Sequence, residues 1–231
     1  LKEVFMLINA DFSQSVFMTP EQYQWTASPQ AGVDRVMLDR IGSEKARATS
    51  LVRYAQLSVF PVHDHPQGEE ILVLEGVFSE QGHDYPAGWY LRNPDGTSHQ
   101  PSSKEGAVIF VKLRQMREDD QQSVRINSQL AENWHTETMH GDAPPQAVCE
   151  LFQNENETVQ LRRLQKNDVL ALDVKKLTEI LIIAGALTSD GQYFPKHSWL
   201  RLAQGSTTEL IAATDQVIVY IKTMKHITNL D

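Results

Sequence analysis

The chain has 231 residues, 41% of them hydrophobic and 22% charged, and 30 acidic against 21 basic residues give a formal net charge of −9. This length suffices for one large or two small folded units, and an ordinary apolar fraction without low-complexity tracts argues against disorder. The acidic balance disfavours a nucleic-acid partner. The single cysteine, Cys149, excludes a disulfide framework and a multi-cysteine zinc site. No apolar run is long enough for a transmembrane helix, so we expect a cytoplasmic protein without nucleic-acid or membrane partners.

The first clear strand pattern lies in residues 70–93. EILVLEG (70–76) is a short apolar run rich in branched residues and ends at Gly76. The turn sequence SEQG follows, then a second strand pattern, WYLRN (89–93), and a turn centred on Gly96. This succession predicts antiparallel strands joined by tight turns.

The same succession returns 109 residues further along the chain. Residues 70–99 align without a gap on residues 179–208. The shared positions are Glu70/Glu179, Gly76/Gly185, Gly82/Gly191, Pro86/Pro195, Leu91/Leu200, Arg92/Arg201 and Gly96/Gly205. We therefore predict an all-β protein with two copies of one domain, 1–118 and 119–231, each an antiparallel sandwich or small barrel.

Three histidines and a glutamate in the first copy are the candidate site. His63 and His65 stand two apart in FPVHDH, so on a strand both imidazoles project from one face. Glu69 follows shortly after, and His99 lies beyond the next hairpin. Three imidazoles and one carboxylate that converge in a small barrel would suit Zn, Fe, Mn, Ni or Cu and leave room for water or substrate.

The spacing of these residues resembles the two cupin motifs. HDHPQGEEILVLEG resembles the first motif, and GWYLRNPDGTSHQPS resembles the second, with Gly88, Pro94, Gly96 and His99 in its fixed places. The surrounding sequence is similar to the cupin-like domain of the ChrR anti-sigma-factor family over about residues 10 to 116. The segments that carry this similarity are RATSLVRYA, EEILVLEGVFSE and FVKLRQ. The resemblance implies two tandem cupin barrels (double-stranded β-helix, or jelly-roll).

The resemblance also implies a ligand set and a metal. Carried over position by position, His63, His65, Glu69 and His99 bind one divalent ion in the N-terminal cupin, with Zn as in the regulator and Fe, Mn or Ni as alternatives. Leu57 and Ser102 depart from the cupin pattern, but neither replaces a ligand. Glu70 also satisfies the looser motif spacing. Because the second copy keeps this glutamate as Glu179 while it loses the ligands, we expect Glu70 to be structural and Glu69 to be the ligand.

The second copy has none of these four residues. At the spacing of 109, the four positions become Leu172, Val174, Thr178 and Thr208. None of them offers an imidazole or a carboxylate, so we predict a degenerate C-terminal cupin without a metal. The alternative for this copy is an apolar ligand pocket in the emptied barrel.

Three functions stay open from the sequence, one of which is a structural or storage role without small-molecule chemistry. The ChrR resemblance implies a metal-binding sensor or small-molecule-binding protein related to the oxidative-stress response, with a small molecule or an oxidant as its ligand. The regulator's helical zinc domain has no counterpart in residues 1–55, which hold neither His nor Cys, so sigma-factor binding is not expected. The alternative is an Fe(II) cupin dioxygenase that acts on a small diketone or aromatic substrate. The two copies predict either a monomeric pseudo-dimer or a homodimer.

Overall fold

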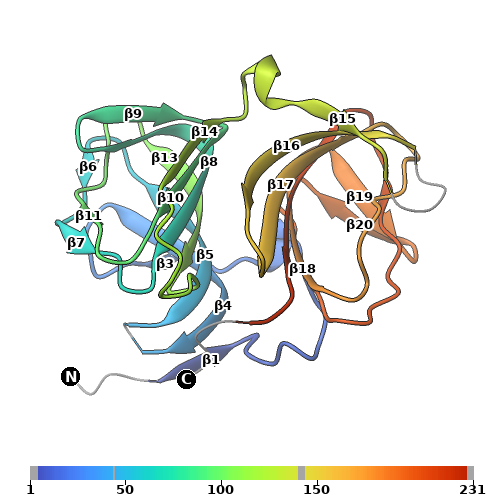
Figure 1. Ribbon diagram of the computed structural model, residues 1–231. Coiled ribbons are helices and arrows are strands. Elements are labelled where there is room, and N and C mark those ends of the chain that lie inside the picture. Colours follow the sequence, from blue (N-terminus) through green and yellow to red (C-terminus); the bar gives the residue numbers. More distant parts are fainter. Residues whose placement is uncertain (1–4, 44, 140–143, 228–231) are drawn as a thin grey trace. The chain divides into compact units, whose positions relative to one another are not determined.

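The protein is described by a computed structural model, which covers residues 5–43, 45–139 and 144–227 (Figure 1). The described part is almost entirely β and has two short 3-10 helices, η1 (Pro20–Gln22) and η2 (Ala131–Asn133). It forms two compact units, each a jelly-roll barrel of antiparallel strands. The predicted all-β class and the two tandem cupin barrels are thus confirmed. None of the described helices is long and apolar enough to cross a membrane.

The first unit comprises residues 5–10 and 24–129. Its main sheet has the strand order β1-β4-β5-β13-β8-β10-β14, and the far end of β8 continues into the facing layer, where it pairs with β9 and β12. The strands of this unit are β1 (Met6–Ile8), β3 (Thr26–Ala27), β4 (Val33–Gly42), β5 (Arg47–Tyr54), β6 (Ser58–Val59), β7 (His63–Asp64), β8 (Glu69–Glu80), β9 (His83–Pro86), β10 (Trp89–Asn93), β11 (Ser98–His99), β12 (Ser102–Ser103), β13 (Ala107–Leu113) and β14 (Val124–Asn127).

The second unit comprises residues 11–23 and the described part of 130–227. Its main sheet has the strand order β15-β16-β17-β23-β18-β21-β2, and a smaller sheet has the order β20-β19-β22. The strands of this unit are β2 (Val16–Met18), β15 (His135–Glu137), β16 (Gln146–Gln153), β17 (Glu157–Leu164), β18 (Leu177–Ala184), β19 (Ala186–Ser189), β20 (Gln192–Pro195), β21 (Trp199–Leu202), β22 (Ile211–Ala212) and β23 (Val217–Met224).

The sequence repeat is also a repeat of strand register. Tyr90 of β10 pairs with Leu72 of β8, and Trp199 of β21 pairs with Leu181 of β18, 109 residues later. β9 and β20 likewise span equivalent residues. A slip of one residue would turn every side chain to the other face, so this agreement places equivalent positions on equivalent faces of the two barrels.

Each unit contains a short strand from the segment that leads into the other copy. β2 lies at the start of the chain but pairs with β21 of the second unit, while β14 follows residue 118 and pairs with β10 of the first unit. Residues 16–18 and 125–127 are related by the repeat spacing of 109. Each unit therefore holds the bulk of one predicted domain, 1–118 or 119–231, together with the leading strand of the other.

Both barrels have apolar interiors built from inward-facing strand residues. In the first unit, Val33, Tyr54, Ile71, Phe78 and Leu91 belong to one buried cluster. The cluster of the second unit has a larger number of aliphatic residues, and Leu172 packs against it. Burial of these side chains is the main stabilising contribution in each barrel, because alternate residues of every strand bring apolar area out of water.

The hairpin between β8 and β9 depends on a left-handed turn. Gln81 and Gly82 both have positive φ, 48° and 78°, and connect the paired residues Glu80 and His83, as in a type I′ turn. A Cβ at position 82 would meet no atom within 4 Å. We therefore expect Gly82→Ala to lower the free energy of unfolding by about 1 kcal/mol through backbone strain alone, measured by chemical denaturation. An unchanged free energy of unfolding would contradict this turn conformation.

Candidate metal centre

Two short paired strands and one tight turn bring the four predicted residues together. In the β7–β11 pair, His63 lies directly opposite His99. The backbone N–H of His65 donates to Thr97 O at 3.0 Å, which extends this pairing. Gln67 and Gly68 have φ of 58° and 77°, and Gly68 N donates to His65 O at 2.9 Å, so the chain reverses and returns Glu69 to His65.

The four side chains form a close cluster at one end of the barrel. Their candidate ligand atoms all lie within 4.8 Å of one another. His99 Nε2 is 3.2 Å from His63 Nε2, and Glu69 Oε2 is 3.4 Å from the Nε2 atoms of both His65 and His99. Ligands that are about 2.1 Å from one ion are themselves about 3.0–3.4 Å apart at octahedral or tetrahedral angles, so these separations fit a common ion.

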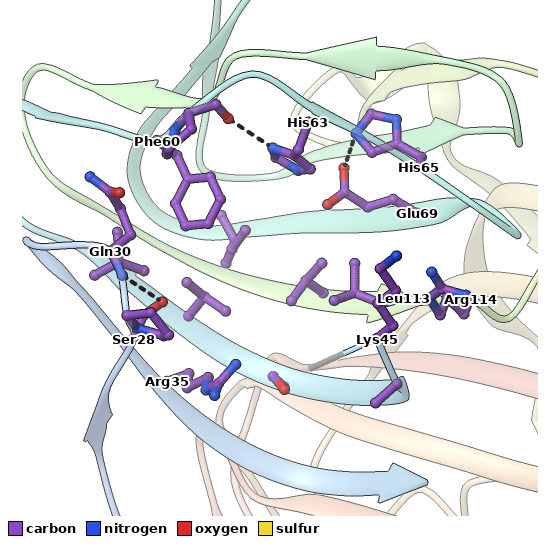
Figure 2. Close-up of a pocket in the computed structure, with 18 of the residues that line it drawn as sticks. Ser28, Gln30, Arg35, Lys45, Phe60, His63, His65, Glu69, Leu113 and Arg114 are labelled. Carbon is purple, nitrogen blue, oxygen red and sulfur yellow. Dashed lines mark hydrogen bonds and ion pairs between the residues drawn. The ribbon is translucent and has the colours of Figure 1, made fainter. Parts of the chain in front are cut away.

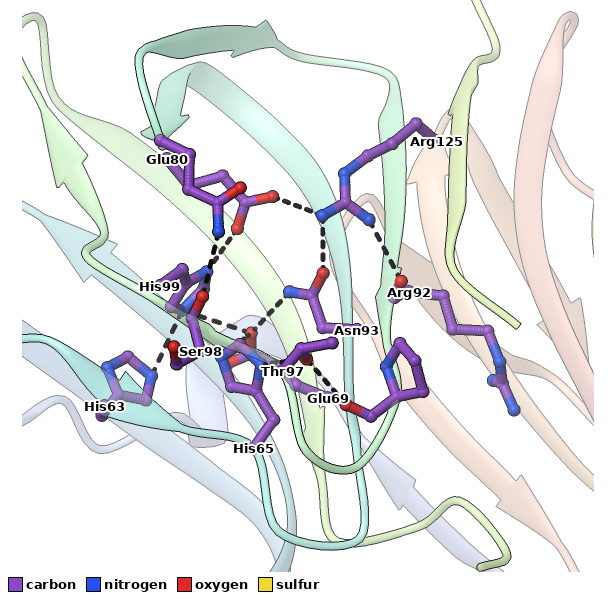
Figure 3. A network of polar contacts seen from close by, with 12 residues as sticks. His63, His65, Glu69, Glu80, Arg92, Asn93, Thr97, Ser98, His99 and Arg125 are labelled. Carbon is purple, nitrogen blue, oxygen red and sulfur yellow. Dashed lines mark hydrogen bonds and ion pairs between the residues drawn. The ribbon is translucent and has the colours of Figure 1, made fainter. Parts of the chain in front are cut away.

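Hydrogen bonds on the far side of each ring fix which nitrogen carries the proton; Figure 2 shows the one of His63, and Figure 3 shows the contact of His99 with Glu80. His63 Nδ1 lies 3.0 Å from the carbonyl of Pro61, which can only accept. His65 Nδ1 lies 2.8 Å from the Thr97 hydroxyl, whose own proton goes to Pro94 O. His99 Nδ1 contacts the carboxylate of Glu80. Each Nδ1 is therefore a donor, and three Nε2 lone pairs converge with a carboxylate.

Lone pairs and a carboxylate that point at one another repel, and a cation between them would remove this repulsion. His65 Nε2 is buried and has no hydrogen-bond partner in the described part of the chain. Burial lowers the pKa of His65, as do the neighbouring His99 and His63, against the opposing effect of Glu69 and Glu80, so the net result favours the neutral imidazole that a metal requires. The donor atoms of these four residues are thus suited to bind a divalent metal ion.

A second layer of polar residues holds the ligands (Figure 3). Asn93 Nδ2 donates to Glu69 Oε2 at 3.1 Å, and Arg125 Nη2 donates at 2.6 Å both to Asn93 Oδ1 and to Glu80 Oε1. Burial would raise the pKa of Glu80, but the hydrogen bond from His99 and the charge of Arg125 outweigh it and hold the pKa below its usual value. Glu80 is therefore ionised and orients His99.

A cavity of about 580 Å³ opens onto this cluster (Figure 2). His63, His65 and Glu69 lie in its wall, and strands β4, β5 and β13 also contribute residues to it. This volume lies within the range of about 300–1,000 Å³ that is common for small-molecule sites. Three of the four candidate ligands can therefore be reached by a small molecule inside the barrel.

Glu70 lies on the other face of β8 and has a structural role. Its carboxylate accepts from the Tyr90 hydroxyl at 2.8 Å and lies 3.2 Å from Arg92 Nη1. In the second copy, Glu179 accepts from Trp199 Nε1 at 2.6 Å, at the equivalent positions. This agrees with the prediction that Glu70 is structural, because the same contact is kept in the copy without the cluster.

The described residues of the second barrel form no comparable cluster. Leu172 packs against the apolar core, Thr178 is buried and Val174 is 49% exposed. Among the described residues, the only group of three or more acidic, His or Cys side chains placed to hold a metal is that of the first unit. The second copy therefore keeps the barrel, while residues without imidazole or carboxylate groups occupy the four equivalent positions.

The supporting residues Glu80, Asn93 and Arg125 were not predicted from the sequence. A signal for two of them was available, because Glu80 and Asn93 become Ser189 and Leu202 at the repeat spacing and so change together with the ligands. Arg125 lies beyond the predicted boundary at 118. It reaches the site only because β14 joins the first unit.

Arg125 gives a test of this second layer. We expect Arg125→Met to weaken metal binding by about 10- to 100-fold without removing a ligand, because Glu80 and Asn93 lose their shared donor. Metal affinity would be measured by competition with a chromophoric chelator. Arg117→Met is the matched control, since Arg117 is an exposed arginine that pairs with Asp119. Equal affinities for the two variants would contradict a supporting role of Arg125.

Comparison with known proteins gives a family-model match for one part of the chain and a fold for the whole. Residues 13–117 match the family model described as ChrR Cupin-like domain. No curated protein sequence matches the chain significantly.

Several solved structures resemble the whole chain at low sequence identity. One is described as the "putative glyoxylate induced protein" from Pseudomonas aeruginosa, with a TM-score of 0.74, 12% identity, and coverage of 100% of this chain and 95% of that one. A "putative dioxygenase" from Nostoc punctiforme has a TM-score of 0.73 and 12% identity over 94% of this chain and 85% of that one. The pirin YhhW from Escherichia coli, in complex with nickel(II), has a TM-score of 0.65 and 11% identity over 91% and 99% of the two chains. At these identities the likeness concerns the fold alone.

Proposed function

From the premise that the chain carries a ChrR cupin-like domain in residues 13–117 and folds as a pair of cupin barrels, we propose that it is a metal-dependent cupin that acts on a small organic molecule. His63, His65, Glu69 and His99 hold the ion. The observation that carries the proposal is the cavity of about 580 Å³, whose wall includes three of these four side chains. A purely structural metal site needs no such opening.

The reaction class that we propose is dioxygenation. When bound, an ion such as Fe(II) would supply the means of bringing molecular oxygen and substrate together. Both oxygen atoms enter the substrate, which itself provides the electrons, so no external reductant is needed. The coarse likeness to a structure described as a "putative dioxygenase" supports this choice among cupin activities.

The chain's own residues prepare the site for this chemistry. Three neutral imidazoles and one carboxylate leave a divalent ion with a net charge of +1, and four protein ligands leave positions for further ligands on an ion that prefers six. Thr97, Glu80 and Asn93 keep the rings and Glu69 oriented. Val52, Ile109 and Val111 line the cavity and exclude water from the side that faces the substrate.

The test is metal analysis followed by oxygen consumption. The protein would be purified without chelators or nickel resin, loaded with Fe(II) under anaerobic conditions, and screened in an oxygen electrode with small diketones and aromatic compounds. We expect uptake of one O₂ per substrate consumed. Full iron loading without substrate-dependent uptake would contradict the dioxygenase proposal.

A second candidate is a sensing role, which the ChrR family match supports. In this case the site holds zinc, an oxidant or a small molecule alters the metal site, and no turnover occurs. Retention of zinc through purification together with zinc release by peroxide, followed with a chromophoric chelator, would favour this role.

A further inference from the structure

The inner face of strand β4 carries an arginine inside the barrel of the first unit. Val33 and Arg35 both line the cavity, in keeping with the alternation of side chains along a strand. Asp34, between them, faces outward and pairs with Arg53 at 2.8 Å. The acid next to Arg35 in the sequence is thus directed to the opposite face and cannot neutralise it.

Arg35 has no partner for its side chain among the described residues. Its Nε is buried without a hydrogen-bond acceptor, and neither an ion pair nor a hydrogen bond of its guanidinium is found in the described part of the chain. Arg35 as a whole is only partly buried, but a buried Nε–H group without an acceptor is unfavourable. An anion from outside the chain would remove this cost.

Arg35 and the metal-binding cluster lie on opposite sides of the cavity. Figure 2 shows Arg35 across the cavity from His63, His65 and Glu69, and it shows Lys45 beside Leu113 and Arg114. Lys45 is exposed and also has no ion pair among the residues that the structure describes. The carboxylates of the wall are Glu69, within the cluster, and the exposed Asp64.

The other two arginines of the wall are already engaged within the chain. Arg40 donates to Ser43 O, and Arg114 Nη1 donates to Gln67 Oε1 at 3.4 Å. Besides these charged residues, the wall includes the apolar side chains of Val52 and Ile109. Among the described residues of the wall, Arg35 is therefore the partly buried cationic side chain without a partner, whereas Lys45 is exposed.

We infer that the cavity binds an organic anion whose carboxylate pairs with Arg35 and whose apolar body lies against Val52 and Ile109. Arginine suits this task because its planar fork donates two parallel hydrogen bonds to a carboxylate. The opposite end of the ligand faces the His63, His65 and Glu69 cluster. Only this last element rests on the proposed function, which the inference deepens by naming a substrate class.

The test compares an acid with its neutral amide. The probes are 3-benzoylpropionate, which has a carboxylate at one end and a ketone and ring at the other, and its primary amide. Dissociation constants would be measured by isothermal titration calorimetry on the metal-free and the zinc-loaded protein. We expect the parent to bind the acid at least about tenfold more tightly than the amide in both states, because charge-assisted hydrogen bonds are the stronger ones.

Substitutions assign this preference to a residue. Arg35→Gln should abolish the preference for the acid, Arg35→Lys should keep part of it, and Arg53→Gln, a neighbouring arginine on the outer face, should keep all of it. Circular dichroism would verify that each variant is folded. If Arg35→Gln fails to fold, the comparison rests on the Arg35→Lys variant, whose partial loss is still required.

The outcomes separate this inference from the proposed function. Absence of acid binding by the parent at millimolar concentration, or an acid preference that Arg35→Gln retains, would overturn the inference while stoichiometric metal binding leaves the proposed function intact. An Arg35-dependent preference in a protein that never binds metal would support the anion site and overturn the proposed function.

Discussion

The His63→Ala, His99→Ala double variant is expected to retain less than about a tenth of the metal that the parent protein holds after dialysis. The two Nε2 atoms are 3.2 Å apart, and their removal leaves only His65 and Glu69 of the cluster. His65 and Glu69 alone do not hold the ion tightly, because both imidazole ligands and the hydrogen bonds that orient them are removed. Inductively coupled plasma mass spectrometry of both proteins measures this directly.

The control is a double variant of two histidines outside the cluster. His83 and His226 are exposed, so His83→Ala, His226→Ala should leave the metal content unchanged. The fold of the test variant should also persist, because Glu80 keeps its contact with Arg125 when His99 is removed. Equal metal content in the two double variants would contradict the assignment of the cluster as the metal site.

Neighbouring glutamates on β8 should behave in opposite ways. Glu69→Gln is expected to weaken metal binding by at least about tenfold, because it removes the negative charge that offsets the ion. Glu70→Gln is expected to leave metal binding intact but to lower the free energy of unfolding by about 2–4 kcal/mol, because Arg92 loses a buried ionic partner. Chelator competition and chemical denaturation separate the two effects.

The second copy supplies the control for this pair. Glu179→Gln should resemble Glu70→Gln, with lower stability and full metal binding, since Glu179 accepts a hydrogen bond from Trp199 at the equivalent position. A loss of metal in Glu70→Gln that exceeds the loss in Glu69→Gln would exchange the roles of the two acids.

Much of the fold could be predicted because the relevant information is local. The strand patterns and turn glycines repeat at a spacing of 109 residues, and the structure reproduces that spacing in its strand register, as in Tyr90 opposite Leu72 and Trp199 opposite Leu181. Periodicity of two and turn chemistry are short-range signals, and both copies carry them. The same holds for two of the clustered residues, since the short spacing of His63 and His65 brings their ring centroids to 5.3 Å from each other.

The parts of the fold and of the site that the sequence does not predict depend on contacts between distant segments. Nothing in the pattern around Arg125 indicates that β14 pairs with β10, because the partner of an edge strand is a property of the topology. Arg35 likewise has an ordinary strand context, and only the closed barrel turns it toward the cavity that Glu69 also lines. Comparison of the two copies reveals some such residues, as the joint loss of Glu80 and Asn93 in the second copy illustrates.

The most direct measurement is the metal content of the parent protein, purified without chelators or nickel resin and reconstituted in separate samples with Zn²⁺ and Fe²⁺. The three Nε2 lone pairs and the Glu69 carboxylate of the first unit predict one tightly bound divalent ion per chain, with none in the second unit. A content that stays far below one ion per chain after reconstitution, or that reaches two, would contradict the account.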